Sequence, residues 1–598
     1  MTGARSMKFV GVLTLITLLL AAAPPSPLAD AAMRGDRVLV RSLLAKGADV
    51  NAPQGDGMTA LHWASARGDV ELADLLVRAG AKLEAVTRNG AYTPLHLASK
   101  AGYAPVVRRL LKAGSNIKAI TTTGGVSALH LAAGAGSADA VTALLERGSD
   151  PNVRETGWGQ TPLIFAAAYN RVEVVKVLLK RGAHVAITTT VLDLPARDAV
   201  DRTAGQRRNQ TLNAFRKQSS DSQTWRPSSA QVQAAVSAAQ QVQKAGATAE
   251  VAEADPDPSG GEEVAGYSGL VGSQGGLTAL LHAVREGHKE ATALLLNAGA
   301  DINQVSAGDH TSPLLLATIN GHFDLAAQLL QKGANPNLAS DAGATPLFAA
   351  INTQWAPKSR YPQQLAHMLQ KATYLDLMKA LLAAGANPNV RLKKHIWYMS
   401  YTFDLLDVDT RGATPFWRAA YATDVDAMRL LVASGADSKI ATLKTPDRPR
   451  RGGGRGDAAS ARQDPSGLPP VPPDGPAVWP IHAASGVGYG EGYAANAHRH
   501  VPGGWLPAVK YLVEELGADV NARDLNGYNA LHHAAARGDN ELIHYLVQKG
   551  ADVTAVSRKG QTTADMANGP VQRISPFPQT VALLEKLGSK NNRRCMSC

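Results

Sequence analysis

Apolar and polar positions follow one another along most of the chain with the spacing of short paired helices. In residues 93–98 a Thr-Pro dipeptide opens an apolar run in which Leu95 and Ala98 lie three residues apart, on one helical face. The threonine hydroxyl caps free backbone N–H groups, and proline at the first helical position loses no needed donor. A second apolar run over 106–111 ends at Gly114, where a left-handed residue closes a helix easily. The pattern predicts two short antiparallel helices.

The same pattern returns along the whole chain. Successive capping positions are 33, 34, 34 and 34 residues apart in a first block, and 34 and 33 residues apart in a second. The twelve capping residues are Ser26, Thr59, Thr93, Ser127, Thr161, Thr278, Ser312, Thr345, Thr414, Trp479, Asn529 and Thr562. Because no single unit can bury its Leu and Ala face alone, the units must stack on their neighbours. The expected fold class is an all-α solenoid of about twelve helix-turn-helix units.

This repeat resembles the ankyrin-repeat family, whose period is about 33 residues. Residues 47–51, 333–337, 385–389 and 517–521 look like the family's segment after the second helix. The resemblance implies hairpins that project away from the helices and a concave face that binds proteins. It also implies that a histidine recurring at one repeat position bridges neighbouring units. These histidines are His62, His96, His130, His482 and His532.

Composition and repeat spacing divide the chain into seven parts. We expect a signal peptide (1–25), a first repeat block of five units (26–187), a low-complexity linker (188–275), a second block of four units with insertions (276–441), a Pro/Gly/Arg-rich linker (442–477), a third block of three units (478–588) and a basic tail (589–598). Both linkers lack the apolar residues of a core and are predicted to be mostly disordered. In the first linker, Val232, Val236 and Ala239 fit one side of a helix.

Thr345 and Thr414 are 69 residues apart, about 36 more than one repeat period. The extra residues are expected in two segments, 352–373 and 391–411. Within the second, residues 395–403 are too apolar for an idle loop. They either fold back on the stack or bind a partner.

The N-terminus has the pattern of a secretory signal peptide. Arg5 and Lys8 precede an apolar run at 9–20, which is shorter than the roughly 20 residues of a membrane span. The expected location is the periplasm of a bacterium or the outside of the cell. An uncleaved N-terminal anchor and a cytosolic scaffold with a misread leader are the alternatives.

Charge and motifs argue against several classes of function. The 598 residues carry a net charge of +11, much of it in the insertions and the tail, which favours a solvated surface over a nucleic-acid-binding face. There is no nucleophile elbow, phosphate-binding loop or His-Glu-x-x-His helix, so no enzyme is predicted. His498 and His500 lie near Glu491 and Tyr493, but a third metal ligand is not evident, so no metal is expected.

Exposed aromatic side chains at hairpin tips are the expected anchors for a protein partner of unknown identity, since they give a large contact area at low entropy cost. The candidates are Tyr92, Trp158 and Tyr528. Trp158 has a second interpretation, because flanking glycines allow it to pack on the neighbouring tip. The predicted function is a non-catalytic, exported protein-binding scaffold.

Cys595 and Cys598 are the only cysteines, two residues apart in the basic tail. A prenylation box is disfavoured by its last residues and by export. A disulfide between the two thiols is the simplest interpretation. The third interpretation is a c-type haem attachment motif that lacks its histidine, in which case the chain is part of a longer redox protein.

Overall fold

The protein is described by a computed structural model that covers residues 26–219, 224–248, 267–356, 365–396, 408–445, 464–490, 498–569 and 575–592. The chain falls into two compact units. Unit 1 is Met1–His184 and unit 2 is Val185–Cys598. Each unit is built mainly from pairs of short helices, as the sequence predicted.

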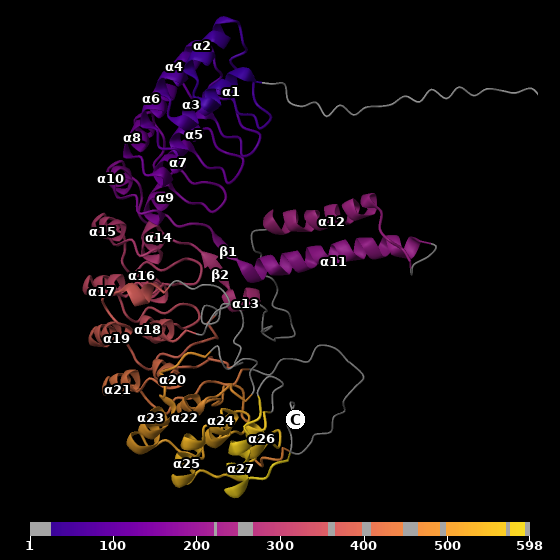
Figure 1. Ribbon diagram of the computed structural model, residues 1–598, viewed down its shortest axis with the longest axis vertical. Helices are drawn as coiled ribbons and strands as arrows, with labels where there is room; N and C mark the ends of the chain where they lie inside the picture. The colour runs from indigo at the N-terminus through magenta and orange to yellow at the C-terminus, as the bar shows by residue number, and fades with distance from the viewer. Residues whose placement is uncertain are drawn as a thin grey trace, which may run out of the picture. The chain divides into compact units, whose positions relative to one another are not determined.

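Unit 1 holds five helix pairs stacked in chain order (Figure 1). The first helices of successive pairs pack on one another in one layer, and the second helices form another layer. The first helices are α1 (Pro27–Arg34), α3 (Ala60–Arg67), α5 (Pro94–Lys100), α7 (Ala128–Ala135) and α9 (Pro162–Ala168). The second helices are α2 (Arg37–Ala45), α4 (Val70–Arg78), α6 (Ala104–Ala113), α8 (Ala138–Glu146) and α10 (Val172–Lys180). The loops between pairs extend from the first-helix side (Figure 1).

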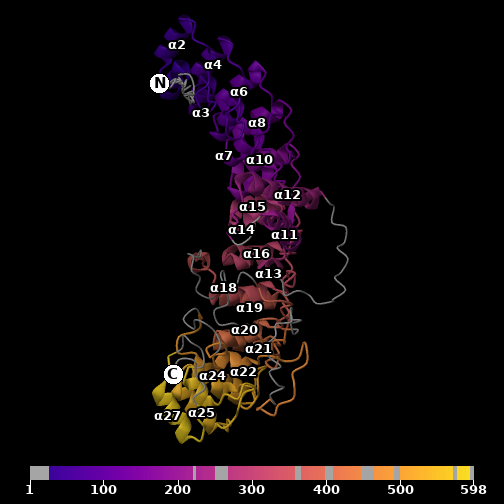
Figure 2. The same cartoon turned by 90° about the vertical axis from the view of Figure 1, so that its right-hand side faces the viewer.

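Unit 2 continues the same design with seven pairs in its described residues, and α14, α16, α18 and α20 follow one another in both views (Figures 1 and 2). Its first helices are α14 (Ala279–Arg285), α16 (Pro313–Ile319), α18 (Pro346–Gln354), α20 (Pro415–Tyr421), α22 (Pro480–Ser485), α24 (Ala530–Ala536) and α26 (Thr563–Ala567). Its second helices are α15 (Lys289–Asn297), α17 (Phe323–Gln331), α19 (Tyr374–Ala383), α21 (Val425–Ala433), α23 (Trp505–Lys510) with a π-helical turn (Tyr511–Glu515), α25 (Asn540–Gln548) and α27 (Pro578–Lys586). Since α20 packs on α22, the second and third repeat blocks form one stack.

The helix starts agree with the caps read from the sequence. All twelve predicted residues occupy the N-cap of a first helix. In α5, for example, the hydroxyl of Thr93 accepts the backbone N–H of His96 at 3.4 Å. The all-α class and the twelve units are therefore confirmed in the described part of the chain.

In five of the repeats, an asparagine after the second helix ties the repeat to the next one. Asn337 donates from Nδ2 to the carbonyl of Gly385 at 2.9 Å and accepts the N–H of Asn387 on Oδ1 at 2.8 Å. The same two bonds recur at Asn51, Asn152, Asn389 and Asn521. Because the asparagine bonds the neighbour in space, the stack keeps its register across the insertions.

The first linker contains more regular structure than its composition predicted. It holds β1 (Val191–Asp193), α11 (Leu194–Gln218), α12 (Ser229–Thr248), α13 (Tyr267–Val271) and β2 (Ser273–Gly275). The strands pair antiparallel, with Val191 opposite Gly275 and Asp193 opposite Ser273. The two long helices pack side by side (Figure 1), yet the only fully buried residues on them are Ala204 and Ala235 among those described. The linker is thus helical without having a substantial core.

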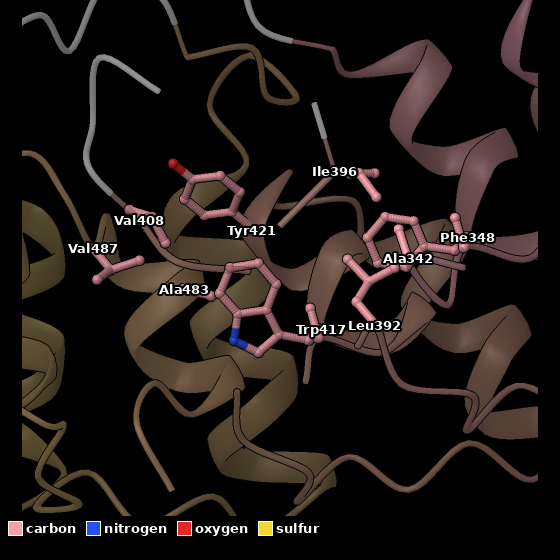
Figure 3. Close-up of a cluster of buried hydrophobic side chains, with 11 residues drawn as sticks. Ala342, Phe348, Leu392, Ile396, Val408, Trp417, Tyr421, Ala483 and Val487 are labelled. Carbon is pink, nitrogen blue, oxygen red and sulfur yellow. The ribbon is translucent and has the colours of Figure 1, made fainter. Parts of the chain in front are cut away.

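The extra segments between Thr345 and Thr414 lie where the spacing placed them. One separates α18 from α19 and contains a 3-10 turn, η1 (Ala366–Leu369). The other begins after Asn389, and its Ile396 is fully buried beside Phe348, Leu392 and Trp417 (Figure 3). This end of the apolar segment therefore folds back on the stack, while residues 397–403 lie outside the described residues.

Candidate protein-binding surface

The three predicted aromatic anchors have different environments. Trp158 is 58% exposed, and its backbone N–H donates to Glu155 Oε1 at 2.8 Å, so the tip is fixed while the indole faces solvent. Tyr92 is half-buried, with the ammonium of Lys100 5.4 Å above its ring. Trp158 and Tyr92 belong to unit 1, and both present aromatic surface on its hairpins.

Tyr528 is not an exposed anchor, which corrects the prediction. Its side chain is 1% exposed, its ring packs against His532 and His533, and its hydroxyl hydrogen-bonds Gln561 Oε1 on the next hairpin. The residue has the same sequence position as Tyr92, but the position that holds Leu97 in the repeat of Tyr92 holds His533 here. Tyr528 therefore stabilises the hairpins of unit 2.

A continuous apolar surface follows the first helices of unit 1. We define the inner strip as the residues four positions after the caps of the second to fifth helix pairs, which are Trp63, Leu97, Leu131 and Phe165; the first pair has Asp30 at this position. All four are half-buried. Trp63 donates from Nε1 to Gln54 Oε1 at 2.7 Å, which places this face of the helices toward the hairpins. The inner strip is thus an unbroken row of large apolar side chains that stays partly open to solvent.

The equivalent positions in unit 2 are covered by other parts of the chain. They are His282, Leu316, Ala349, Arg418, Ala483, His533 and Met566, and all but Leu316 are buried. The guanidinium of Arg418 donates to Asn352 Oδ1 at 2.9 Å and to the carbonyl of Trp355 at 2.6 Å. His533 Nε2 lies 3.0 Å from a carboxylate oxygen of Asp524. Only unit 1 therefore offers an open strip among the described residues.

Two more tyrosines of unit 1 were missed by the sequence analysis. Tyr169 follows α9 and is 60% exposed, and Tyr103 precedes α6 and is 40% exposed. Both lie in the short connection from a first to a second helix, a place where small or polar residues stand in most other units. That departure from the repeat pattern was the signal that could have identified them.

The repeated histidines are structural bridges. In the second unit, Nδ1 of His62 accepts the backbone N–H of Thr59 at 3.1 Å. Nε2 must then carry the proton, and it donates to the carbonyl of Tyr92 on the next hairpin at 3.0 Å. The other bridges run from His96 to Ala119, from His130 to Gln160, from His482 to Ala522 and from His532 to Gln561. The structure thus assigns these histidines to the scaffold.

Known protein families match most of the repeat region. The family described as ankyrin repeats (3 copies) matches residues 28–121, 113–189 and 280–391, and the one described as ankyrin repeats (many copies) matches 494–547 and 531–575. Together with the paired helices and hairpin-bridging histidines, these matches decide the identity of the fold. The chain belongs to the ankyrin-repeat family.

Relatives of this ankyrin-repeat protein share only segments of it. It is 42% identical over 64 residues to ankyrin repeat and SAM domain-containing protein 6 of Rattus norvegicus, covering 10% of this chain and 7% of the relative. It is 38% identical over 72 residues to protein phosphatase 1 regulatory subunit 27 of Mus musculus, covering 12% and 46%. It is 27% identical over 161 residues to alpha-latrocrustotoxin-Lt1a of Latrodectus tredecimguttatus, covering 27% and 8%. The chain spans less than half the length of each.

Burial keeps the bridging histidines of this ankyrin-repeat protein neutral. Loss of hydration lowers the pKa of His130 and of His482 to about 4 and that of His532 to about 3, and it lowers the pKa of His62 and His96 in the same direction. Protonation of Nδ1 would set its new N–H against the N–H of the capping residue. The bridge therefore requires the neutral ring.

The histidine pair considered as metal ligands lies in an aromatic cluster. His498 stacks on Tyr421 with ring centres 4.3 Å apart and packs against Trp505, while Nδ1 of His500 bonds the carbonyl of Val501. Glu491 lies outside the described residues, as do Tyr493, Cys595 and Cys598. Within the described ranges there is no group of three or more His, Cys, Asp or Glu side chains arranged to hold a metal ion. The disulfide and haem interpretations of the cysteines stay predictions.

None of the helices in the described ranges has the length and apolar character needed to cross a membrane. The run at 9–20 lies outside these ranges.

Proposed function

We propose that this ankyrin-repeat protein is a non-catalytic scaffold that binds a partner protein through the concave face of unit 1. The observation that supports this proposal is the difference between the two units. Four large apolar side chains form the open inner strip of unit 1, whereas six of the seven equivalent residues of unit 2 are buried. A partner that covers such a row gains about 25 cal/mol of binding free energy for each Å² of apolar surface removed from water.

The surroundings of the inner strip suit a protein ligand. Trp158, Tyr169 and Tyr103 are exposed on the same unit and are residue types that often dominate binding energy. The first helices that carry the strip are held in place by packing against their neighbours, so binding a partner costs little conformational entropy. The partner's identity does not follow from these features, but its contact surface must be largely apolar.

The binding face can be tested by site-specific crosslinking in the full chain. A photoreactive phenylalanine at Leu97 should form an adduct with a discrete partner in native extract, and one at Arg108, exposed on a second helix, should not. Leu97→Glu combined with Leu131→Glu should lower partner capture by about tenfold or more, because a partner's apolar surface would have to desolvate two carboxylates. Equal adducts at the two positions would place the binding face elsewhere.

Export is a second part of the proposal and rests on the sequence alone. Arg5, Lys8 and the apolar run at 9–20 have the order of a signal peptide. Mass spectrometry of the natural protein should find an N-terminus that begins after this run. Protein that retains Met1 in the cytosolic fraction would instead support an intracellular scaffold.

A further inference from the structure

The α11–α12 helix pair, which we call the arm, buries little side-chain surface along its seam, the line where the two helices touch. Among its described residues only Ala204 on α11 and Ala235 on α12 are fully buried. The helices form because their residues are mostly good helix formers, and Asp193 caps α11 by accepting the N–H of Ala196 at 2.9 Å. An isolated pair with so little buried apolar surface gains little stability from packing.

Contacts between the start of α11 and the end of α12 show how the two helices face each other. Gln243 Nε2 donates to Asp201 Oδ1 at 2.9 Å, and a Cβ added at Gly246 would meet the methyl groups of Val200. The helices are therefore antiparallel, and residues whose numbers add up to about 444 lie at the same level. This register places Val236 level with Arg208 and Val232 level with Leu212.

One side of the arm presents an open apolar strip. Each residue turns an α-helix by about 100°, so Val232 and Val236 point about 60° and 100° away from the buried Ala235. On α11, Arg208 and Leu212 are turned about 40° and 80° from Ala204 in the same sense. In an antiparallel pair, equal rotations away from the seam lead to the same side of the pair. Val232 and Val236 are 42% and 40% exposed, and with Gln240 they line a surface hollow of about 510 Å³.

The arm also carries a net positive charge. Residues 194–248 contain eight Arg or Lys and three Asp, while the whole chain has a net charge of +11. Arg202 forms an ion pair with Asp198 at 2.9 Å, but Arg208 and Arg226 extend into solvent. The apolar strip is therefore bordered by positive charge.

We propose that this side of the arm binds an acidic amphipathic helix of a partner protein and so completes a three-helix bundle. The partner's apolar face would cover Val232, Val236 and Leu212, and its carboxylates would approach Arg208. A second copy of the arm would bring like charges together, which disfavours self-association. Nucleic acid offers no apolar face for the two valines. This site is separate from the inner strip and does not depend on the function proposed for unit 1.

The proposal can be tested with the full chain and a synthetic peptide. The probe is a fluorescein-labelled helix of three heptads with Leu at the a and d positions and Glu at most others, and its control has Gln in place of Glu. We expect the acidic peptide to raise its fluorescence anisotropy on titration, with weaker binding at high salt. The Gln peptide should bind about tenfold more weakly or not at all.

Matched substitutions locate the site on the arm. Arg208→Glu should weaken binding of the acidic peptide by about tenfold, and the double variant Val232→Ser, Val236→Ser should do the same. Arg207→Glu makes an equal change in charge about 100° around α11, where the side chain is turned from Ala204 in the opposite sense, and should weaken binding by no more than about threefold. Circular dichroism checks that the helices persist.

Several results would overturn the proposal. They are equal binding of the acidic and Gln peptides, equal effects of the substitutions at Arg207 and Arg208, sedimentation showing dimers that the two serines abolish, and displacement of the peptide by duplex DNA at lower concentration than by unlabelled peptide. Leu97→Glu with Leu131→Glu changes the inner strip only and should leave peptide binding intact.

Discussion

Trp417→Ala is expected to destabilise the packing around α20 by about 4 kcal/mol, the upper range for truncating a buried aromatic side chain. The indole of Trp417 is fully buried among Phe348, Leu392 and Val408, and it stacks on Tyr421 with ring centres 5.2 Å apart (Figure 3). Its Nε1 also donates to the carbonyl of Val478 at 3.0 Å. Truncation leaves a cavity where two repeat blocks meet, and the carbonyl of Val478 keeps only its bond from the backbone N–H of Thr442.

Because repeat arrays often unfold in parts, local hydrogen exchange is the suitable measurement. Peptides from α18, α20 and α22 should exchange several hundredfold faster in the Trp417→Ala variant, by about tenfold for each 1.4 kcal/mol. Trp158→Ala removes the same side chain from an exposed site and should change stability by less than about 0.5 kcal/mol. Unchanged exchange around α20 would mean that the indole does not hold the two blocks together.

Acidification from pH 7.5 to pH 5 is expected to cost unit 1 about 2 kcal/mol through His130 alone. Burial lowers the pKa of His130 in the folded protein to about 4, whereas the unfolded side chain has its ordinary value near 6.5. Between these values the unfolded chain binds the proton and the folded chain does not. The stability that the neutral ring contributes is therefore complete above pH 6.5 and is lost as the pH falls toward 4.

Urea unfolding at the two pH values checks this prediction. His130→Gln should lower stability at pH 7.5, because the bridge to Gln160 is weakened, and should reduce the further loss at pH 5 by about 2 kcal/mol. His184→Gln alters an exposed histidine and should leave the loss on acidification unchanged. If His130→Gln retains the full acid sensitivity, the ring is not kept neutral by burial.

The sequence by itself determined the repeating unit. The caps, the proline after several of them and the glycines that close helices act within a few residues along the chain, so the order of residues is enough to place them. The bridging role of His62 and its equivalents followed from the resemblance to ankyrin repeats. The spacing of Val232, Val236 and Ala239 indicated a helix where α12 lies, but α11 was missed, because low apolar content was taken as disorder although Ala, Gln and Arg favour helices.

Only the tertiary structure decided which repeats have an open face. Phe165 and Arg418 stand at the same position of the repeat, but Arg418 is covered because its guanidinium reaches Asn352 and Trp355, more than sixty residues earlier in the chain. Tyr92 and Tyr528 likewise share a position, and only Tyr528 is closed off by the histidines and the hairpin beside it. Exposure depends on segments that are distant in sequence and near in space, so repeats with the same local pattern present different surfaces.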